Sequence, residues 1–163
     1  VSDSRKGITY FVEACKLLQG QNVEVVFLGG RRDTGKLEAL PLPSHVLGYL
    51  HTPADISAAY SACDVFVTPS LEDNLPNTIM EAMSCGTPCV GFHVGGIPEM
   101  IDHKQNGYVA EYKNAPDLAN GIVFCLENYG ELSKASREKV VASYGEEVVA
   151  QRYMEIYNKL LVK

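Results

Sequence analysis

The chain has 163 residues, which is the length of one domain and enough to bury a core. Hydrophobic residues make up 46% and charged residues 21%, values that exclude disordered, collagen-like and coiled-coil classes. A net charge of -6 argues against a nucleic-acid-binding protein, because phosphate contacts require a dense basic surface. No apolar run is long enough for a membrane-spanning helix, and the N-terminus is not typical of a signal peptide. Because the chain does not begin with Met, we expect it to be a fragment.

The cysteines and histidines predict a reducing compartment and no metal site. An odd number of cysteines, none in a Cys-x-x-Cys pair, stands among apolar neighbours, so we expect small buried side chains in the cytosol. The histidines do not share a helical face at metal-ligand spacing. The residues concerned are Cys15, Cys63, Cys85, Cys89, Cys125, His45, His51, His93 and His103.

The first part of the chain alternates between strand and helix signals. The pair Arg5 and Lys6 is expected after the tail of a strand and directly before a helix over residues 7–19, whose apolar residues recur at spacings of three and four. The β-rich run 22–28 predicts a strand. A polar loop and a short strand over 45–50 follow.

Helix-start signals mark the middle of the chain. Thr52 is a typical N-cap, and Pro53 occupies the first position of a helix that ends near Cys63. Residues 64–68 form a continuous apolar run, typical of a strand buried on both faces of a parallel sheet. Another helix is expected over 77–85.

The remaining elements complete the pattern. Short strands are expected at 88–92 and 107–110, a short helix at 98–103, and helical structure from Pro116 to the end. Strands that alternate with helices predict an α/β domain with a mainly parallel sheet and helices on both faces. In such a fold, ligands bind at the carboxyl ends of the strands.

Residues 30–36 match the first seven positions of a phosphate-binding P-loop and follow a predicted strand. The eighth position should be Ser or Thr to hold magnesium, but it is Leu37. Pro41 and Pro43 also leave no room for the long helix that a P-loop requires. We therefore interpret this stretch as a basic loop at a strand end, and we reject a P-loop NTPase.

An acidic loop over 69–76 joins the strand at 64–68 to the next helix. The N-terminus of that helix points into the binding crevice of a parallel sheet, where its N–H groups and dipole favour phosphate. Glu81, about one turn inside the helix, could reach a ribose diol, and Asp73 could hold a second polar ring. In the alternative interpretation, Asp73 and Asn74 cap the helix and Glu81 is an ordinary solvated residue.

Two further features have both a functional and a structural interpretation. The pair Gly95 and Gly96 lets the backbone approach a ligand closely, although paired glycines also occur in plain tight turns. The pair Arg5 and Lys6 suits a pyrophosphate, with a solvated charge pair as the alternative.

In combination, these features resemble the C-terminal domain of the retaining GT-B glycosyltransferases of the large group 1 family. Seven segments match in family order over residues 5–110, which makes the resemblance specific. The segments are 5–7 (RKG), 26–30 (VFLGG), 46–50 (VLGYL), 60–70 (YSACDVFVTPS), 81–88 (EAMSCGTP), 95–99 (GGIPE) and 106–109 (NGYV).

The resemblance implies a role for each matching position. Two carboxylates bracket the donor: Asp73 holds hydroxyls of the transferred sugar, and Glu81 holds the ribose diol of the nucleotide. Lys6 and the N–H groups at the helix start take the diphosphate without a metal ion, and the backbone around Tyr49 meets the base. The implied substrate-binding residues are Lys6, Arg5, Gly30, Tyr49, Leu50, Asn74, Leu75, Pro76, Asn77 and Thr78.

The resemblance also implies a two-domain enzyme, of which residues 1–163 are the donor-binding half with a Rossmann-like sheet; the N-terminal acceptor domain is absent. Such an enzyme transfers sugar from a UDP- or GDP-linked donor to a glycan or lipid-linked acceptor and uses no cofactor. It is cytoplasmic or peripheral to the inner face of the membrane, with any membrane contact made through the missing half. This half alone is expected to bind donor weakly and to transfer nothing.

Two positions depart from the family pattern. The first carboxylate is usually Glu and is here Asp73, and residues 74–76 (NLP) replace a Gly-aromatic-Gly loop. These departures bear on the sugar contacts more than on the nucleotide contacts. The spacing of Asp73 and Glu81 favours the enzyme, whereas the loop 74–76 leaves room for the alternative function, a non-catalytic nucleotide-sugar-binding or regulatory module.

Overall fold

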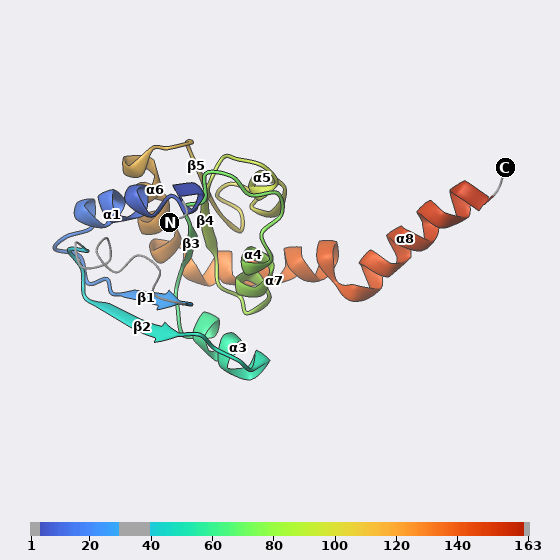
Figure 1. Ribbon diagram of the computed structural model, residues 1–163, viewed down its shortest axis with the longest axis horizontal. Coiled ribbons are helices and arrows are strands. Elements are labelled where there is room, and N and C mark those ends of the chain that lie inside the picture. The colour runs from blue at the N-terminus through green and yellow to red at the C-terminus, as the bar shows by residue number, and fades with distance from the viewer. Residues whose placement is uncertain (1–3, 30–39, 162–163) are drawn as a thin grey trace.

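The computed structural model describes residues 4–29 and 40–161. Figure 1 shows a layered α/β body from which the last helix extends away. Gly30 and the P-loop-like stretch 30–36 lie outside the described residues.

The described strands all pair in parallel, which confirms the expected fold class. They form two hydrogen-bonded sheets, with the orders β1–β2 and β3–β4–β5, and no hydrogen bonds join β1 to β3 within the described residues. The strands are β1 (Val25–Leu28), β2 (Ser44–Gly48), β3 (Phe66–Thr68), β4 (Cys89–Phe92) and β5 (Gly107–Ala110).

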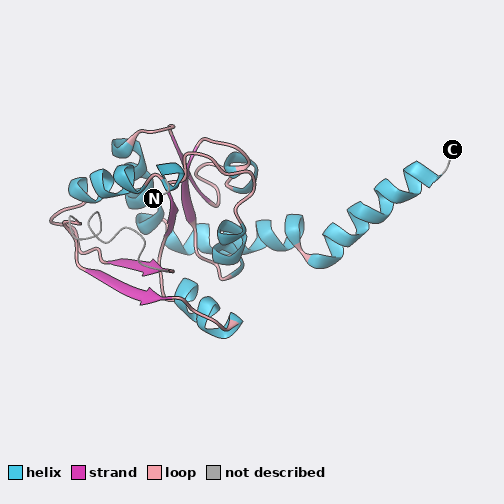
Figure 2. Ribbon diagram, viewed as in Figure 1, coloured by secondary structure: helices cyan, strands magenta, loops and turns pink. Residues whose placement is uncertain are grey.

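Helices flank these strands on both sides (Figure 2). Helices α1 and α6 pack together on one face of the three-stranded sheet, and α4 packs on the other face with α7 behind it. The helices are η1 (Ser4–Lys6), α1 (Ile8–Leu17), α3 (Pro53–Ser61), α4 (Asn77–Ser84), α5 (Ile97–Met100), α6 (Ala115–Glu127), α7 (Tyr129–Tyr144) and α8 (Glu146–Leu161).

The core lies on the two faces of strand β4, as the alternation of side chains along a strand requires. Val90 and Phe92 belong to the cluster under α1 and α6, whereas Cys89 belongs to the cluster under α4 and α5. Both clusters consist of buried hydrophobic residues, and they hold the strand in place. Burial raises the pKa of the Cys125 thiol in the first cluster to about 12, so this cysteine stays protonated.

The helix starts follow the expected cap chemistry. Thr52 is the N-cap of α3, and its Oγ1 accepts a hydrogen bond from the Asp55 N–H at 3.1 Å. Asn114 caps α6 in the same way, accepting from the Asp117 N–H at 2.9 Å, and this cap was not anticipated from the sequence. The helical structure predicted from Pro116 to the end consists of three helices, and α6 ends where the Asn128 side-chain amide donates to the Phe124 carbonyl at 2.8 Å.

Arg5 and Lys6 lie in the 3-10 turn η1 directly before α1, as expected of a basic pair before a helix start, and the Arg5 carbonyl accepts a hydrogen bond from the Leu71 N–H at 2.6 Å. The strand tail expected before this pair lies outside the described residues.

One strand prediction needs correction. The strand expected from residue 64 begins only at Phe66, and Phe66 and Val67 are half-buried. Since side chains of β3 that alternate between its two faces are only half-buried, β3 is not fully buried on both faces as expected. One edge of β3 also has no strand partner among the described residues.

Helix α8 contacts the rest of the domain little and buries none of its described residues. It projects beyond α7 (Figure 1). In the ranges that the structure describes, no helix combines the length and apolar character needed to cross a bilayer. The large apolar side chains that α8 exposes are Tyr153, Met154, Ile156, Tyr157, Leu160 and Leu161.

The close contact of α6 with the sheet depends on Gly121. A Cβ there would lie 2.5 Å from the Tyr108 ring and 2.9 Å from Val90. Gly121→Ala should therefore destabilise the fold by about 1–3 kcal/mol through overpacking, despite the better helix propensity of Ala. A Cβ at Gly130 of α7 meets nothing within 4 Å, so Gly130→Ala should be neutral or stabilising by up to about 1 kcal/mol. Urea unfolding measures both, and a Gly121→Ala variant as stable as Gly130→Ala would contradict the packing.

Candidate functional site

Helix α4 begins at Asn77 with Pro76 as its N-cap, and no side chain of the described residues caps it. The alternative in which Asp73 and Asn74 cap the helix is therefore not what the structure shows. Ile79, Ala82 and Met83 are fully buried and fix the helix on the sheet. Asn77 and Thr78 are exposed, so the first-turn N–H groups and the positive end of the dipole face solvent.

Beside the acidic loop that precedes α4, a hollow of about 440 Å³ is lined by side chains of both charges. Lys6 and Asp73 meet there, with the Lys6 Nζ 3.9 Å from the Asp73 Oδ2. The Lys6 side chain is 65% exposed, and an ion pair of this kind contributes about 0–1 kcal/mol, so the ammonium is available to a ligand. The residues that line the hollow are Arg5, Lys6, Glu72, Asp73 and Asn74.

A glycine contact brings Lys6 to this place. Gly7 has a φ of 61°, and a Cβ on it would lie 1.8 Å from the Pro69 carbonyl oxygen. Only glycine allows the turn η1 to lie against the loop after β3 at this distance. The Lys6–Asp73 contact therefore follows from backbone packing.

Gly95 and Gly96 support the same loop from the other side. A Cβ on Gly95 would lie 1.7 Å from the Asp73 carbonyl oxygen, and one on Gly96 would lie 1.9 Å from the Asn74 carbonyl oxygen. The backbone that approaches these glycines is thus the acidic loop of the protein itself. The glycine pair thus holds Asp73 in place. The sequence suggested either a close approach to a ligand or a plain tight turn, and the structure shows a close approach to the protein's own loop.

Glu81 lies in a second hollow, of about 890 Å³, bounded by α3, α4 and α7. Its Oε2 accepts a hydrogen bond from the Tyr60 hydroxyl at 3.1 Å. Burial and the nearby Glu81 carboxylate both raise the pKa of the Tyr60 phenol above its ordinary value, so the phenol stays protonated and donates. The lining residues are Pro53, Ile56, Ser57, Tyr60, Ser61, Met80, Glu81, Ser84, Cys85, Gly86, Ser133, Lys134 and Arg137.

The sequence did not single out Tyr60 as a functional residue. The sequence did contain a signal for it, because a buried tyrosine on the apolar side of a helix needs a hydrogen-bond partner for its hydroxyl. That the partner would be Glu81, 21 residues further along the chain, required the fold.

The structure thus divides the implied site between two hollows that share no lining residue. Lys6 and Arg5 lie with Asp73 and Asn74, whereas Glu81 lies with Tyr60. The remaining described positions line neither hollow: Tyr49, Leu75, Asn77 and Thr78 are exposed, Leu50 is half-buried and Pro76 is buried.

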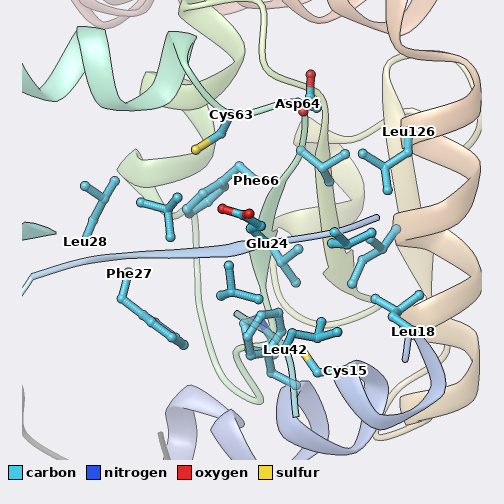
Figure 3. Close-up of a pocket in the computed structure, with 18 of the residues that line it drawn as sticks. Cys15, Leu18, Glu24, Phe27, Leu28, Leu42, Cys63, Asp64, Phe66 and Leu126 are labelled. Atoms are coloured by element: carbon cyan, nitrogen blue, oxygen red, sulfur yellow. The ribbon is translucent and has the colours of Figure 1, made fainter. Parts of the chain in front are cut away.

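A third hollow, of about 540 Å³, separates β1 from β3 (Figure 3). Most of its lining residues are apolar, with Cys15 from α1, Leu18 at the C-cap of α1, Leu126 from α6, and Cys63 beside Asp64 before β3. Burial raises the pKa of the Cys15 thiol to about 11 and also raises that of Cys63, so neither is a thiolate at neutral pH. This slot has no cation among its described lining residues and does not suit a phosphate.

Metal-binding residues do not cluster in the part of the chain that the structure describes. No group of three His, Cys, Asp or Glu side chains lies close enough there to hold an ion. The positive charge near the loop comes from Arg5, Lys6 and the start of α4.

Comparison with known proteins assigns this arrangement to a family. The family model described as "Glycosyl transferases group 1" matches residues 1–128. A relative from Campylobacter jejuni, N,N'-diacetylbacillosaminyl-diphospho-undecaprenol alpha-1,3-N-acetylgalactosaminyltransferase, is 31% identical over 160 residues. That match covers 96% of this chain and 42% of the relative, so the chain spans less than half the length of that protein.

Solved structures confirm the fold. HepE of Anabaena, determined in complex with UDP-glucose, superposes with a TM-score of 0.81 at 23% identity, over 96% of this chain and 46% of HepE. The C-terminal domain of LpcC, a group 1 family glycosyl transferase from Francisella tularensis, gives a TM-score of 0.75 at 22% identity, over 88% of this chain and 82% of that domain. The chain therefore has the fold of one half of a GT-B glycosyltransferase, as the sequence predicted.

Proposed function

The chain belongs to the group 1 glycosyltransferases, and from that membership we propose that it binds the donor of a retaining, metal-independent transferase. The donor is a nucleotide diphosphate sugar. The observation that carries the proposal is the meeting of Lys6 with Asp73 in one hollow, beside a helix α4 whose N-terminus has no side-chain cap among the described residues.

Each part of such a donor has a partner in this arrangement. The diphosphate suits Lys6 and the first-turn N–H groups of α4, because both favour anions. The Asp73 carboxylate suits the hydroxyls of the transferred sugar as an acceptor. Glu81, one turn further along α4, suits the ribose diol, and the base would lie toward Tyr49 and Leu50.

The charges also supply a reason for metal independence. In many nucleotide-sugar sites a divalent cation offsets the charge of the leaving diphosphate. Here the ammonium of Lys6 and the helix dipole carry that role in the proposed function. Donor binding should then persist in a chelator.

The relatives support a choice of nucleotide and of acceptor in this proposal. HepE was determined with UDP-glucose, which favours a UDP-linked donor over a GDP-linked one. The name of the Campylobacter relative describes transfer to a diphospho-undecaprenol acceptor, which favours a lipid-linked glycan. Since this chain spans less than half of that relative, we propose that the acceptor binds to a second, N-terminal half, with the reaction in the cleft between the halves.

A second candidate is a nucleotide-sugar-binding module that catalyses no transfer. Asp73, in place of the longer Glu of the family pattern, favours it, because a carboxylate that is shorter by one methylene reaches less far toward the sugar. Both candidates share the binding step and differ only in product formation.

Lys6 should contribute to diphosphate affinity through its position and not through its charge alone. In a chelator, a UDP-sugar at a hundredfold excess over its dissociation constant should raise the stability of the chain by about 2.7 kcal/mol in thermal unfolding. Lys6→Ala should weaken the affinity by about tenfold, the loss of one charge-assisted hydrogen bond. Lys16→Ala removes the same charge from the exposed side of α1 and should leave the affinity unchanged. Equal losses in both variants, or none in Lys6→Ala, would contradict the proposed site.

Transfer should require more than this chain. We expect the 163-residue chain to form no glycoside product from a UDP-sugar, because it contains only the donor half. A polypeptide that joins it to an N-terminal half of the natural protein should transfer the sugar, and Asp73→Asn should abolish that activity. Product formation by the isolated chain would contradict the two-half account. Donor binding without transfer by the joined polypeptide would select the non-catalytic module.

A further inference from the structure

Tyr60 is held rigidly at the floor of the hollow that contains Glu81. Its side chain is buried, with 4% of the residue exposed. Its ring packs edge-on against Phe66 at a centroid distance of 5.5 Å and an angle of 83°. Its carbonyl accepts a hydrogen bond from the Thr87 Oγ1 at 2.8 Å. With both ring and backbone fixed, the hydroxyl has little freedom of position.

The hydroxyl of Tyr60 donates to one oxygen of Glu81 and leaves the other available. The bond runs to the Oε2 at 3.1 Å, and among the described residues the Oε1 has no hydrogen-bond partner. The two cations of the hollow make no hydrogen bond or ion pair with Glu81 among the described residues: Arg137 donates to the Ser84 carbonyl, and Lys134 lies 3.8 Å from Glu138. Tyr60 is thus the donor that determines the orientation of the carboxylate.

We propose that Tyr60 is a positioning residue that fixes the Glu81 carboxylate for recognition of the ribose diol. The proposal rests on the proposed function, because it assigns Glu81 to the nucleotide. A glutamate on the exposed side of a helix otherwise samples several rotamers, and ordering it costs free energy at the moment of binding. A buried donor that has already selected one rotamer removes that cost.

A purely structural role for Tyr60 makes a different prediction. If the Glu81 contact only satisfies the buried hydroxyl, removing the hydroxyl changes the stability of the domain, and any effect on binding is the same for every ligand of the site. If Tyr60 orients Glu81, the effect is confined to ligands that carry the diol. The two roles are therefore separated by deleting the diol from the ligand.

The experiment compares UDP with 2′,3′-dideoxy-UDP by titration calorimetry on the 163-residue chain. Tyr60→Phe should weaken UDP by about three- to tenfold, the cost of ordering one flexible side chain on binding, and leave 2′,3′-dideoxy-UDP unchanged. Adding Tyr60→Phe to Glu81→Ala should produce no further loss. The matched control is Tyr108→Phe, which removes a hydroxyl that donates to the Asp117 carboxylate at 2.8 Å elsewhere in the domain, and which should change neither affinity.

Four other results would overturn the proposal. Equal weakening of both ligands in Tyr60→Phe would assign Tyr60 a structural role. Unchanged UDP affinity in Tyr60→Phe, together with a loss in Glu81→Ala, would leave Glu81 in the donor site without Tyr60. Unchanged affinity in Glu81→Ala, or no UDP binding by the unmodified chain, would remove the proposed function and the role of Tyr60 with it.

Discussion

The packing of the loop after β3 between two glycine turns determines where the charges of the candidate site lie. On one side, Gly7 lies against the Pro69 carbonyl; on the other, Gly95 lies against the Asp73 carbonyl. No residue with a Cβ fits at either contact without a shift of the backbone. The hydrogen bond from the Leu71 N–H to the Arg5 carbonyl adds a polar contact on the first side. The main chain therefore sets the distance between Lys6 and Asp73, and the weak ion pair between them is not needed to hold the two segments together.

Helix α4 then separates two chemically different regions. The hollow at its N-terminal side is charged and contains Asp73, whereas the hollow at its flank contains Glu81 and a rigid tyrosine. In the proposed function, the order of these groups follows the order of parts in a nucleotide sugar: sugar at Asp73, diphosphate at the start of α4, ribose at Glu81. The slot between β1 and β3 is larger than the charged hollow but has no cation among its described lining residues, which illustrates that volume alone does not identify a site.

The sequence predicted the elements well because caps and apolar spacing are local. Thr52 and Pro53 begin α3 as expected, and the fold class is confirmed. The resemblance to group 1 glycosyltransferases is confirmed by the family match. The prediction of a fully buried strand from residue 64 was wrong, because β3 begins only at Phe66 and a local apolar run does not report how the rest of the chain covers a strand. Tyr60 was also missed, because local periodicity reports that a side chain is buried and not which distant group it meets.

The claim that the start of α4 and Lys6 receive the donor diphosphate is tested most directly by amide chemical shifts. A ¹⁵N-labelled chain would be titrated with a UDP-sugar in a chelator. The account predicts that the largest changes fall on Lys6, Gly7 and residues 77–81. Changes that gather instead around the slot, at residues 25–28 and 63–67, would contradict it and place the ligand between the two sheets.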